Sequence, residues 1–321
     1  MTPAPPRSRT GNRVTALRWV GFLRQLGHHV HLREQTCDCD ADLLVALHAS
    51  KSAPAVAAFR ARHLARPVIV IMTGTDLHPE DGGPLTPVSL RTLGAATRIV
   101  LLSDGGREVI PAALRGRTVT IVQSARAAPA GPRRQDGRLE VIVAGHLRPV
   151  KDPFRAAEAA RLLPEESRIV VVQVGAALSA AMRARAEDEM RRNPRYTWLG
   201  ELPHAATMAC IAAADLMCLT SISEGGPSVI AEAIVSGTPV VSSRIASSVG
   251  LLGADYPGYF TRGDTPGLAA LLLRFEREPA FQDQLRALGL ALAPRFDPAR
   301  ERAAIADLIA GVTEARPGSN S

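Results

Sequence analysis

Short apolar runs alternate with helical segments along almost the whole chain, and this alternation limits the folds open to it. The runs are continuous and rich in β-branched residues, which is typical of strands buried on both faces of a sheet. Strands separated by helices predict an α/β protein with parallel, doubly wound sheets. Strands are expected over 43–48, 67–72, 98–102, 118–122, 139–144, 168–174, 215–219 and 238–242. Helices are expected, among others, over 13–26, 53–65, 153–163, 178–192 and 227–236.

One segment, 124–138, interrupts this alternation. It is rich in Ala, Pro, Gly and Arg and has no apolar period. We therefore interpret 126–138 as a linker between two doubly wound domains, 1–125 and 139–297. The last helical segments have no strand between them, and the tail 313–321 is expected to fray. These helical segments are 264–277, 279–292 and 298–312.

The first domain lacks an element that a doubly wound fold normally has. Such a domain opens on a buried strand, whereas residues 3–11 lead almost directly into the first helix. Either the true start lies upstream, or the first sheet is one strand short.

Composition excludes several classes of protein. The chain has 321 residues, 46% of them hydrophobic and 21% charged, which suits two domains with buried cores and excludes disordered, coiled-coil and collagen-like chains. No apolar run is long enough to span a bilayer, and the N-terminus has no apolar signal region. Four cysteines without a CxxC pair do not make a disulfide scaffold, so we expect a cytoplasmic protein.

The positive charge is concentrated in the first part of the chain. Residues 1–130 contain 16 basic and 9 acidic residues, and the remainder contains 22 of each, so the whole net charge of +7 lies before residue 131. This predicts an anionic partner. Aromatic residues are only 4% and do not alternate with basic runs, so nucleic acid is not expected. Of the 38 basic residues only Lys51 and Lys151 are lysines.

The most specific motif is SISEGGPSVIAEAIVSGTPVVSS, residues 221–243. Gly225-Gly226-Pro227 opens a helix whose free N–H groups favour an anion, and the glycines let a ligand approach the backbone. Two turns into the helix, Glu232 can accept two hydrogen bonds from a vicinal diol such as a ribose. Glu224 can do the same for sugar hydroxyls. The structural alternative is an ordinary βαβ turn with a solvated glutamate.

A second motif is VIVAGHLRPVKDP, residues 141–153. A predicted strand ends at Gly145, and the loop after it carries His146, Arg148 and Lys151. Ligands of open parallel sheets bind outside the carboxyl ends of the strands. Cations at this place suit a diphosphate and stabilise the charge that develops as it leaves. The alternative is a solvated loop with ordinary charges.

Together these motifs resemble nucleotide-sugar glycosyltransferases of the GT-B fold, closest to family GT4, in which two Rossmann-like domains face a central cleft. The resemblance implies that Glu224 lies against the donor sugar, that Glu232 holds the nucleotide ribose and that Lys151 contacts the diphosphate. His146 stands where the family has Arg, and Arg148 is the candidate to supply the missing charge. The segment 298–312 matches the family's terminal helix, which crosses back to the first domain.

The first half resembles a narrower group, the selenosugar synthases of selenoneine biosynthesis. The similar stretches are TPAPPRSRTGNRVTALRW (2–19), ALHASKSA (46–53), TGTDL (73–77), QSA (123–125) and GHLRPVKDPFRAAEAA (145–160). Those enzymes join selenium from selenophosphate to the anomeric carbon of a UDP-sugar. The resemblance implies transfer from UDP-GlcNAc or UDP-glucose to selenophosphate, which gives a 1-seleno-sugar, UDP and phosphate.

Polar residues at strand and helix ends of the first half suit an anionic acceptor. Each has a structural alternative: Asn12 and Thr75 as caps, His48 as a core histidine, and Asp76 as the cap of the next helix.

The predicted site residues are Lys151, Arg148, Glu224 and His48 for catalysis; His146, Gly225, Gly226, Pro227, Ser228 and Glu232 for donor binding; and Gly11, Asn12, Arg13, Lys51, Thr73, Thr75 and Asp76 for acceptor binding.

Transfer to a selenium nucleophile requires few catalytic groups. Because selenium is acidic and largely deprotonated at neutral pH, it needs little general-base help. Catalysis then rests on positioning and on stabilising the departing UDP. Residues 139–297 contain no Asp-x-Asp motif, so we expect no metal and no other cofactor. The expected partners are the UDP-sugar and selenophosphate, without stable membrane association.

Other functions stay open at this point. A GT4-like enzyme with a hydroxyl acceptor in envelope glycan synthesis would turn its basic half toward a membrane or a lipid phosphate. A non-catalytic nucleotide-sugar binding module is disfavoured, because binding alone needs no leaving-group cation. A UDP-sugar epimerase is a more distant option. No Gly-x-Gly-x-x-Gly occurs, which argues against a nicotinamide enzyme.

Overall fold

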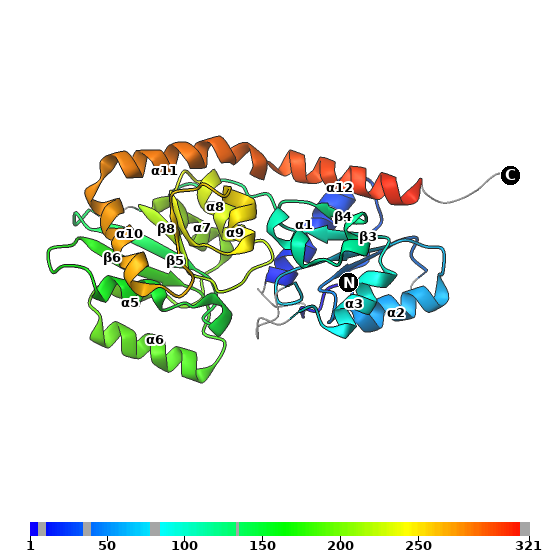
Figure 1. Ribbon diagram of the computed structural model, residues 1–321, viewed down its shortest axis with the longest axis horizontal. Coiled ribbons are helices and arrows are strands. Elements are labelled where there is room, and N and C mark those ends of the chain that lie inside the picture. The colour runs from blue at the N-terminus through cyan, green and yellow to red at the C-terminus, as the bar shows by residue number, and fades with distance from the viewer. Residues whose placement is uncertain (6–10, 35–39, 78–83, 133–134, 315–321) are drawn as a thin grey trace. The chain divides into compact units, whose positions relative to one another are not determined.

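The chain forms two α/β units in the computed structural model, which describes residues 1–5, 11–34, 40–77, 84–132 and 135–314 (Figure 1). The first unit comprises Met1–Gln123, Glu224–Gly226 and Pro298–Ser321. The second unit comprises Ser124–Ser223 and Pro227–Asp297. Each unit is built on a parallel sheet, so the predicted α/β fold is confirmed.

The first unit contains a four-stranded sheet in the order β1-β2-β3-β4 among the described residues. Its strands are β1 (Leu44–Leu47), β2 (Val68–Ile71), β3 (Arg98–Leu101) and β4 (Thr118–Thr120). Its helices are α1 (Gly11–Gln25), α2 (Ala53–Arg62), α3 (Pro87–Ala95), η1 (Asp104–Val109), α4 (Ala112–Arg115) and α12 (Pro298–Thr313).

Strand β2 shows why the apolar runs of the sequence are continuous. Ile69 and Ile71 pack into one core cluster, with Trp19 of α1 and Ile305 of α12. Val68 and Val70 point to the opposite face and pack with α2 and α3. Successive side chains of a strand face opposite sides, so a strand covered on both faces must be apolar at every position.

Residue 1 occupies the outer edge of β1. The Met1 nitrogen donates a hydrogen bond to the Val45 carbonyl at 2.7 Å, and the Leu47 N–H donates to the Met1 carbonyl at 3.1 Å. This is the bonding pattern of one residue of a parallel neighbouring strand. Met1 therefore satisfies two polar backbone groups at this edge of β1, the Val45 carbonyl and the Leu47 N–H.

The described residues of the second unit form a six-stranded parallel sheet in the order β10-β9-β8-β5-β6-β7. The strands are β5 (Leu139–Ala144), β6 (Ile169–Val174), β7 (Tyr196–Trp198), β8 (Leu216–Leu219), β9 (Val240–Ser243) and β10 (Tyr259–Phe260). The helices are η2 (Pro149–Lys151), α5 (Arg155–Arg161), α6 (Ala180–Arg192), α7 (His204–Ala213), α8 (Ser228–Val235), α9 (Ala246–Leu252), α10 (Thr265–Arg277), α11 (Pro279–Leu292) and η3 (Ala293–Phe296).

The strand order of this sheet reverses next to β5. The chain runs from β5 outward to β6 and β7, then returns to place β8 on the other side of β5. The two loops that leave β5 and β8 diverge at this point, and ligands of open α/β sheets bind in the crevice so formed. Both motifs singled out in the sequence follow these two strands.

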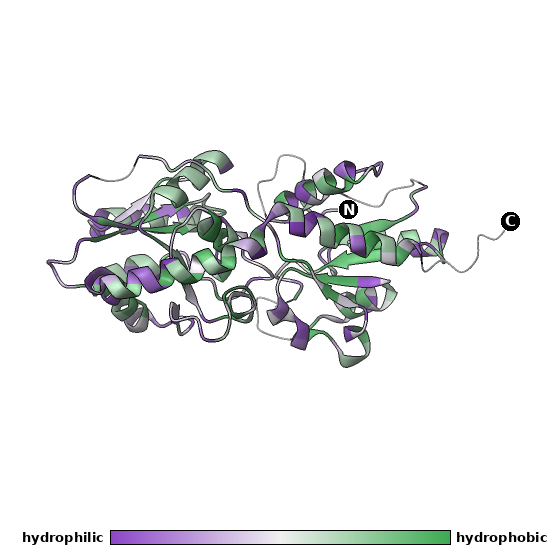
Figure 2. Ribbon diagram, turned by 90° about the horizontal axis from the view of Figure 1, so that it is seen from above, coloured by the Kyte–Doolittle hydropathy of each residue, from purple (hydrophilic) through white to green (hydrophobic). Residues whose placement is uncertain are grey.

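The eight strands expected from the sequence are all present, with shifts of one or two residues at their ends. Two further strands, β7 and β10, were not expected, because runs of three and two residues are too short to give a pattern. Figure 2 shows the strands as hydrophobic and the helices as mixed. Among the described residues, no helix has both the length and the apolar character needed to cross a membrane.

Candidate functional site

Lys151 lies at the switch point of the second unit, as the last residue of the turn η2. The loop after β8 holds this turn: the Thr220 hydroxyl donates to the Lys151 carbonyl at 3.0 Å, and the Ile222 N–H donates to the Val150 carbonyl at 2.9 Å. The half-buried side chain crosses the end of β5, because a Cβ at Gly145 would lie 3.8 Å from its Cδ. The ammonium group is thus carried on a backbone anchored at the end of the sheet.

Asp152, directly after Lys151, has a left-handed backbone with φ 45° and ψ 53°. The Arg155 Nε donates to its carboxylate at 2.7 Å, and the Arg155 Nη1 donates to the Thr265 hydroxyl of α10 at 2.6 Å. The hydrogen bond to Asp152 raises the pKa of Arg155. The conformation that ends η2 is therefore held by an ion pair anchored to a second helix.

This backbone conformation makes a prediction about Asp152. Left-handed geometry costs an L residue with a Cβ about 1–2 kcal/mol, and glycine avoids that cost. Asp152→Ala and Asp152→Gly both lose the bond to Arg155, but only alanine keeps the strain. We expect the alanine variant to be less stable than the glycine variant by about 1 kcal/mol in urea denaturation. Equal stabilities would show that the backbone at this position relaxes.

His146 is oriented by the loop after β6. The Ala176 N–H donates to its Nδ1 at 3.1 Å. The two loops touch closely: a Cβ on Gly175, which has φ 147°, would lie 2.0 Å from the Gly145 carbonyl oxygen. The buried Gln173 amide donates to that same carbonyl at 3.1 Å. His146 thus has a defined ring orientation at the start of the loop that carries Arg148 and Lys151.

Glu232 lies in the second turn of α8, with 8% of the residue exposed. Its Oε1 is 3.1 Å from the Nε2 of His204, the first residue of α7. The imidazole itself is 68% exposed. Pro227 precedes α8, and Ser228 is its first residue, as the motif predicts. Sequence reasoning missed His204, because nothing local distinguishes it from any other surface histidine.

Residues Glu224–Gly226 group with the first unit. The Ser103 hydroxyl donates to the Gly225 carbonyl at 3.0 Å. A Cβ at Gly225 would lie 2.6 Å from the Gly74 nitrogen, and a Cβ at Gly226 would lie 2.5 Å from the Leu102 Cβ. The sequence suggested that these glycines let a ligand approach the backbone. In the structure, Gly74 and Leu102 are the residues that lie close to them.

His48 follows β1 and is almost fully buried, with φ 70°. Burial lowers its pKa, an effect opposed by Asp76 and assisted by the charge of Lys51. The Lys51 N–H donates to its Nδ1 at 3.4 Å, and its Nε2 lies 3.1 Å from the Thr75 hydroxyl oxygen. His48 is therefore within hydrogen-bond distance of Thr75.

Asp76 holds together the loops that follow β1 and β2. Its buried carboxylate accepts hydrogen bonds from the N–H groups of Ala49 at 2.7 Å, Thr73 at 2.9 Å and Gly74 at 3.1 Å. The alternative that Asp76 caps the next helix is wrong, because the side chain of Thr86 caps α3.

The remaining predicted acceptor residues lie at two places in the first unit. Lys51 is exposed beside His48. Gly11 and Asn12 begin α1, and the Thr2 hydroxyl lies 3.4 Å from the Asn12 carbonyl. Arg13 in the same turn has its Nη1 3.8 Å from a carboxylate oxygen of Glu34. The charge of Arg13 is therefore partly balanced by an acid of the same unit.

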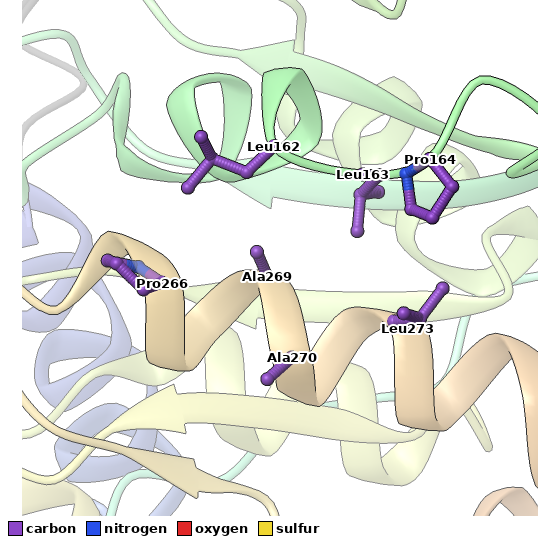
Figure 3. Close-up of a pocket in the computed structure, with 7 residues that line it drawn as sticks. All are labelled: Leu162, Leu163, Pro164, Pro266, Ala269, Ala270 and Leu273. Atoms are coloured by element: carbon purple, nitrogen blue, oxygen red, sulfur yellow. The ribbon is translucent and has the colours of Figure 1, made fainter.

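A groove on the second unit lies between the end of α5 and α10 (Figure 3). All of its lining side chains are apolar: Leu162, Leu163, Pro164, Pro266, Ala269, Ala270 and Leu273. Such a lining does not suit a phosphate or a sugar. Across the described part of the chain, no three His, Cys, Asp or Glu side chains gather as a metal site would require.

Residues 125–287, just over half of the chain, match the family model described as glycosyl transferases group 1. The chain belongs to this family. The matched residues include the loop after β5 and the whole of α8, so the family assignment covers both motifs of the second unit. No curated protein matches the sequence.

Several solved structures have a similar fold. Anabaena Alr3699/HepE in complex with UDP-glucose is 20% identical, with a TM-score of 0.70 over 84% of this chain and 79% of that one. The UDP-forming α,α-trehalose-phosphate synthase from Burkholderia vietnamiensis is 15% identical, with a TM-score of 0.70 over 98% and 80%. At these identities the likeness concerns the fold, which is the GT-B fold of this glycosyltransferase family.

Proposed function

We propose that this group 1 glycosyltransferase transfers a sugar from a UDP-sugar, UDP-GlcNAc or UDP-glucose, to selenophosphate. The main support for the UDP-sugar donor is the position of Lys151, which lies on an anchored turn at the switch point of the second sheet. The family supports sugar transfer. HepE, a protein of similar fold, was crystallised with UDP-glucose, which supports a UDP-sugar as the donor.

The donor is held by residues of both motifs. Glu232 accepts hydrogen bonds from the ribose hydroxyls, and Glu224 accepts them from the hydroxyls of the sugar. The start of α8, with Pro227 and Ser228, faces the nucleotide with its free N–H groups. Lys151, assisted by Arg148 and His146, contacts the diphosphate, so these positive and hydrogen-bonding groups act without a metal.

The acceptor is held by residues of the first unit. Lys51 attracts the selenophosphate dianion, and the Thr75 hydroxyl, which His48 orients, donates a hydrogen bond to it. Thr73 and Asp76 shape the loop that carries Thr75, whereas Gly11, Asn12 and Arg13 add donors and positive charge at the start of α1. The resemblance of the stretches 46–53 and 73–77 to selenosugar synthases supports this choice of acceptor.

The transfer balances as a displacement at the anomeric carbon. A selenium lone pair forms the carbon–selenium bond while the bond from that carbon to the diphosphate oxygen breaks, and its electron pair leaves on UDP. Stabilising this developing charge is the task of Lys151. Water then cleaves the selenium–phosphorus bond, which releases phosphate and the 1-seleno-sugar.

The proposal is tested by incubating the protein with UDP-GlcNAc or UDP-glucose, with and without selenophosphate. We expect UDP release that depends on selenophosphate, together with a sugar product that carries the isotope pattern of selenium by mass spectrometry. The control is the same mixture without protein. UDP release that is independent of selenophosphate, with no selenium in any product, would show that selenophosphate is not the acceptor. It would favour a hydroxyl acceptor instead.

A further inference from the structure

We infer that His204 is a positioning residue for the nucleotide ribose and acts through Glu232. The inference rests on the proposed function, because it assumes that Glu232 binds the ribose diol. It assigns a role to a histidine outside both sequence motifs.

The two side chains meet from different helices of the second unit. His204 begins α7, and Glu232 lies in the second turn of α8. Their Nε2 and Oε1 atoms are 3.1 Å apart. The buried Thr238 hydroxyl, just beyond α8, donates to the Ile211 carbonyl of α7 at 2.7 Å. A second hydrogen bond therefore ties the two segments together, seven residues after His204 and six residues after Glu232.

The unequal exposure of the two side chains suggests which one orients the other. Only 11% of the Glu232 side chain is accessible, against 68% of that of His204. A vicinal diol binds both oxygens of a carboxylate, so the plane of the carboxylate must be fixed. A hydrogen bond from Nε2 fixes the rotation of the carboxylate. The same Oε1 keeps a second lone pair for a ribose hydroxyl.

The test measures binding of UDP and of 2′-deoxy-UDP by calorimetry to the wild type and to His204→Ala, His204→Phe and His204→Gln. A hydrogen bond to a charged group is stronger than one between neutral groups, and part of its contribution reaches the ligand. We expect about fivefold to tenfold weaker UDP binding for the alanine and phenylalanine variants. The glutamine variant should recover most of the affinity, because its amide can donate from a position close to that of Nε2.

The deoxynucleotide isolates the ribose contact. It lacks one of the two hydroxyls, so the loss caused by His204→Ala should be much smaller for 2′-deoxy-UDP than for UDP. His29→Ala, a change of an exposed histidine in the first unit, is the matched control and should leave both affinities unchanged.

Three results would overturn the inference: UDP affinity unchanged in His204→Ala, tighter UDP binding in that variant, or an equal loss for both nucleotides. Failure of the proposed donor site is distinguished by Glu232→Ala. If that change leaves UDP affinity intact, the donor assignment itself is wrong. If Glu232→Ala weakens UDP binding and His204→Ala does not, only the role of His204 fails.

Discussion

Lys151→Ala will lower the turnover number about 100-fold to 1,000-fold, whereas the dissociation constant for the UDP-sugar will change only a few-fold. In the proposed reaction the ammonium group matters most when the bond to UDP breaks, because negative charge then develops on the leaving oxygen. An interaction that strengthens in the transition state affects kcat more than ground-state binding. Steady-state UDP release and calorimetric donor binding measure the two effects separately.

The surroundings of Lys151 make this substitution easy to interpret. Its carbonyl is held by Thr220 and its turn by Ile222, so truncating the side chain leaves the backbone anchors in place. Arg191→Ala removes an exposed cation of the same unit and is the control for charge alone. Equal losses in turnover and in donor affinity for Lys151→Ala would mean that the lysine is only a ground-state contact.

Asp76→Ala will lower the free energy of unfolding of the first unit by about 3 kcal/mol or more, because each buried donor without a partner costs about 1–3 kcal/mol. The change leaves the N–H groups of Ala49, Thr73 and Gly74 without their acceptor. Asp76→Asn keeps one acceptor oxygen and should fall between alanine and the wild type. Urea denaturation followed by circular dichroism measures the loss.

Asp104→Ala is the matched control, since it removes an exposed carboxylate from the same unit. This control should change the stability by less than about 0.5 kcal/mol. If Asp76→Ala proves no more destabilising than Asp104→Ala, the two loops do not depend on the buried carboxylate.

The sequence predicted the strands that are buried on both faces, because such strands must be apolar at every position. This is why 139–144 was placed at the bounds of β5, whereas the three-residue β7 was missed. It also predicted that Lys151 follows β5 and that Pro227 opens the helix of Glu232. These relations are local, since each depends on residues a few positions apart.

Only the tertiary structure decided which partners these side chains have. His204 and Glu232 are 28 residues apart, Ala49 and Asp76 are 27 apart, and Arg155 and Thr265 are 110 apart. Periodicity along a chain reports which face of an element is buried, and it carries no information about which polar atoms meet after the sheet has assembled. Which polar side chains come into contact depends on the strand order, which returns β8 to the side of β5. The motifs of the family can therefore be recognised in the sequence, whereas the hydrogen bonds that hold each candidate functional side chain are a property of the fold.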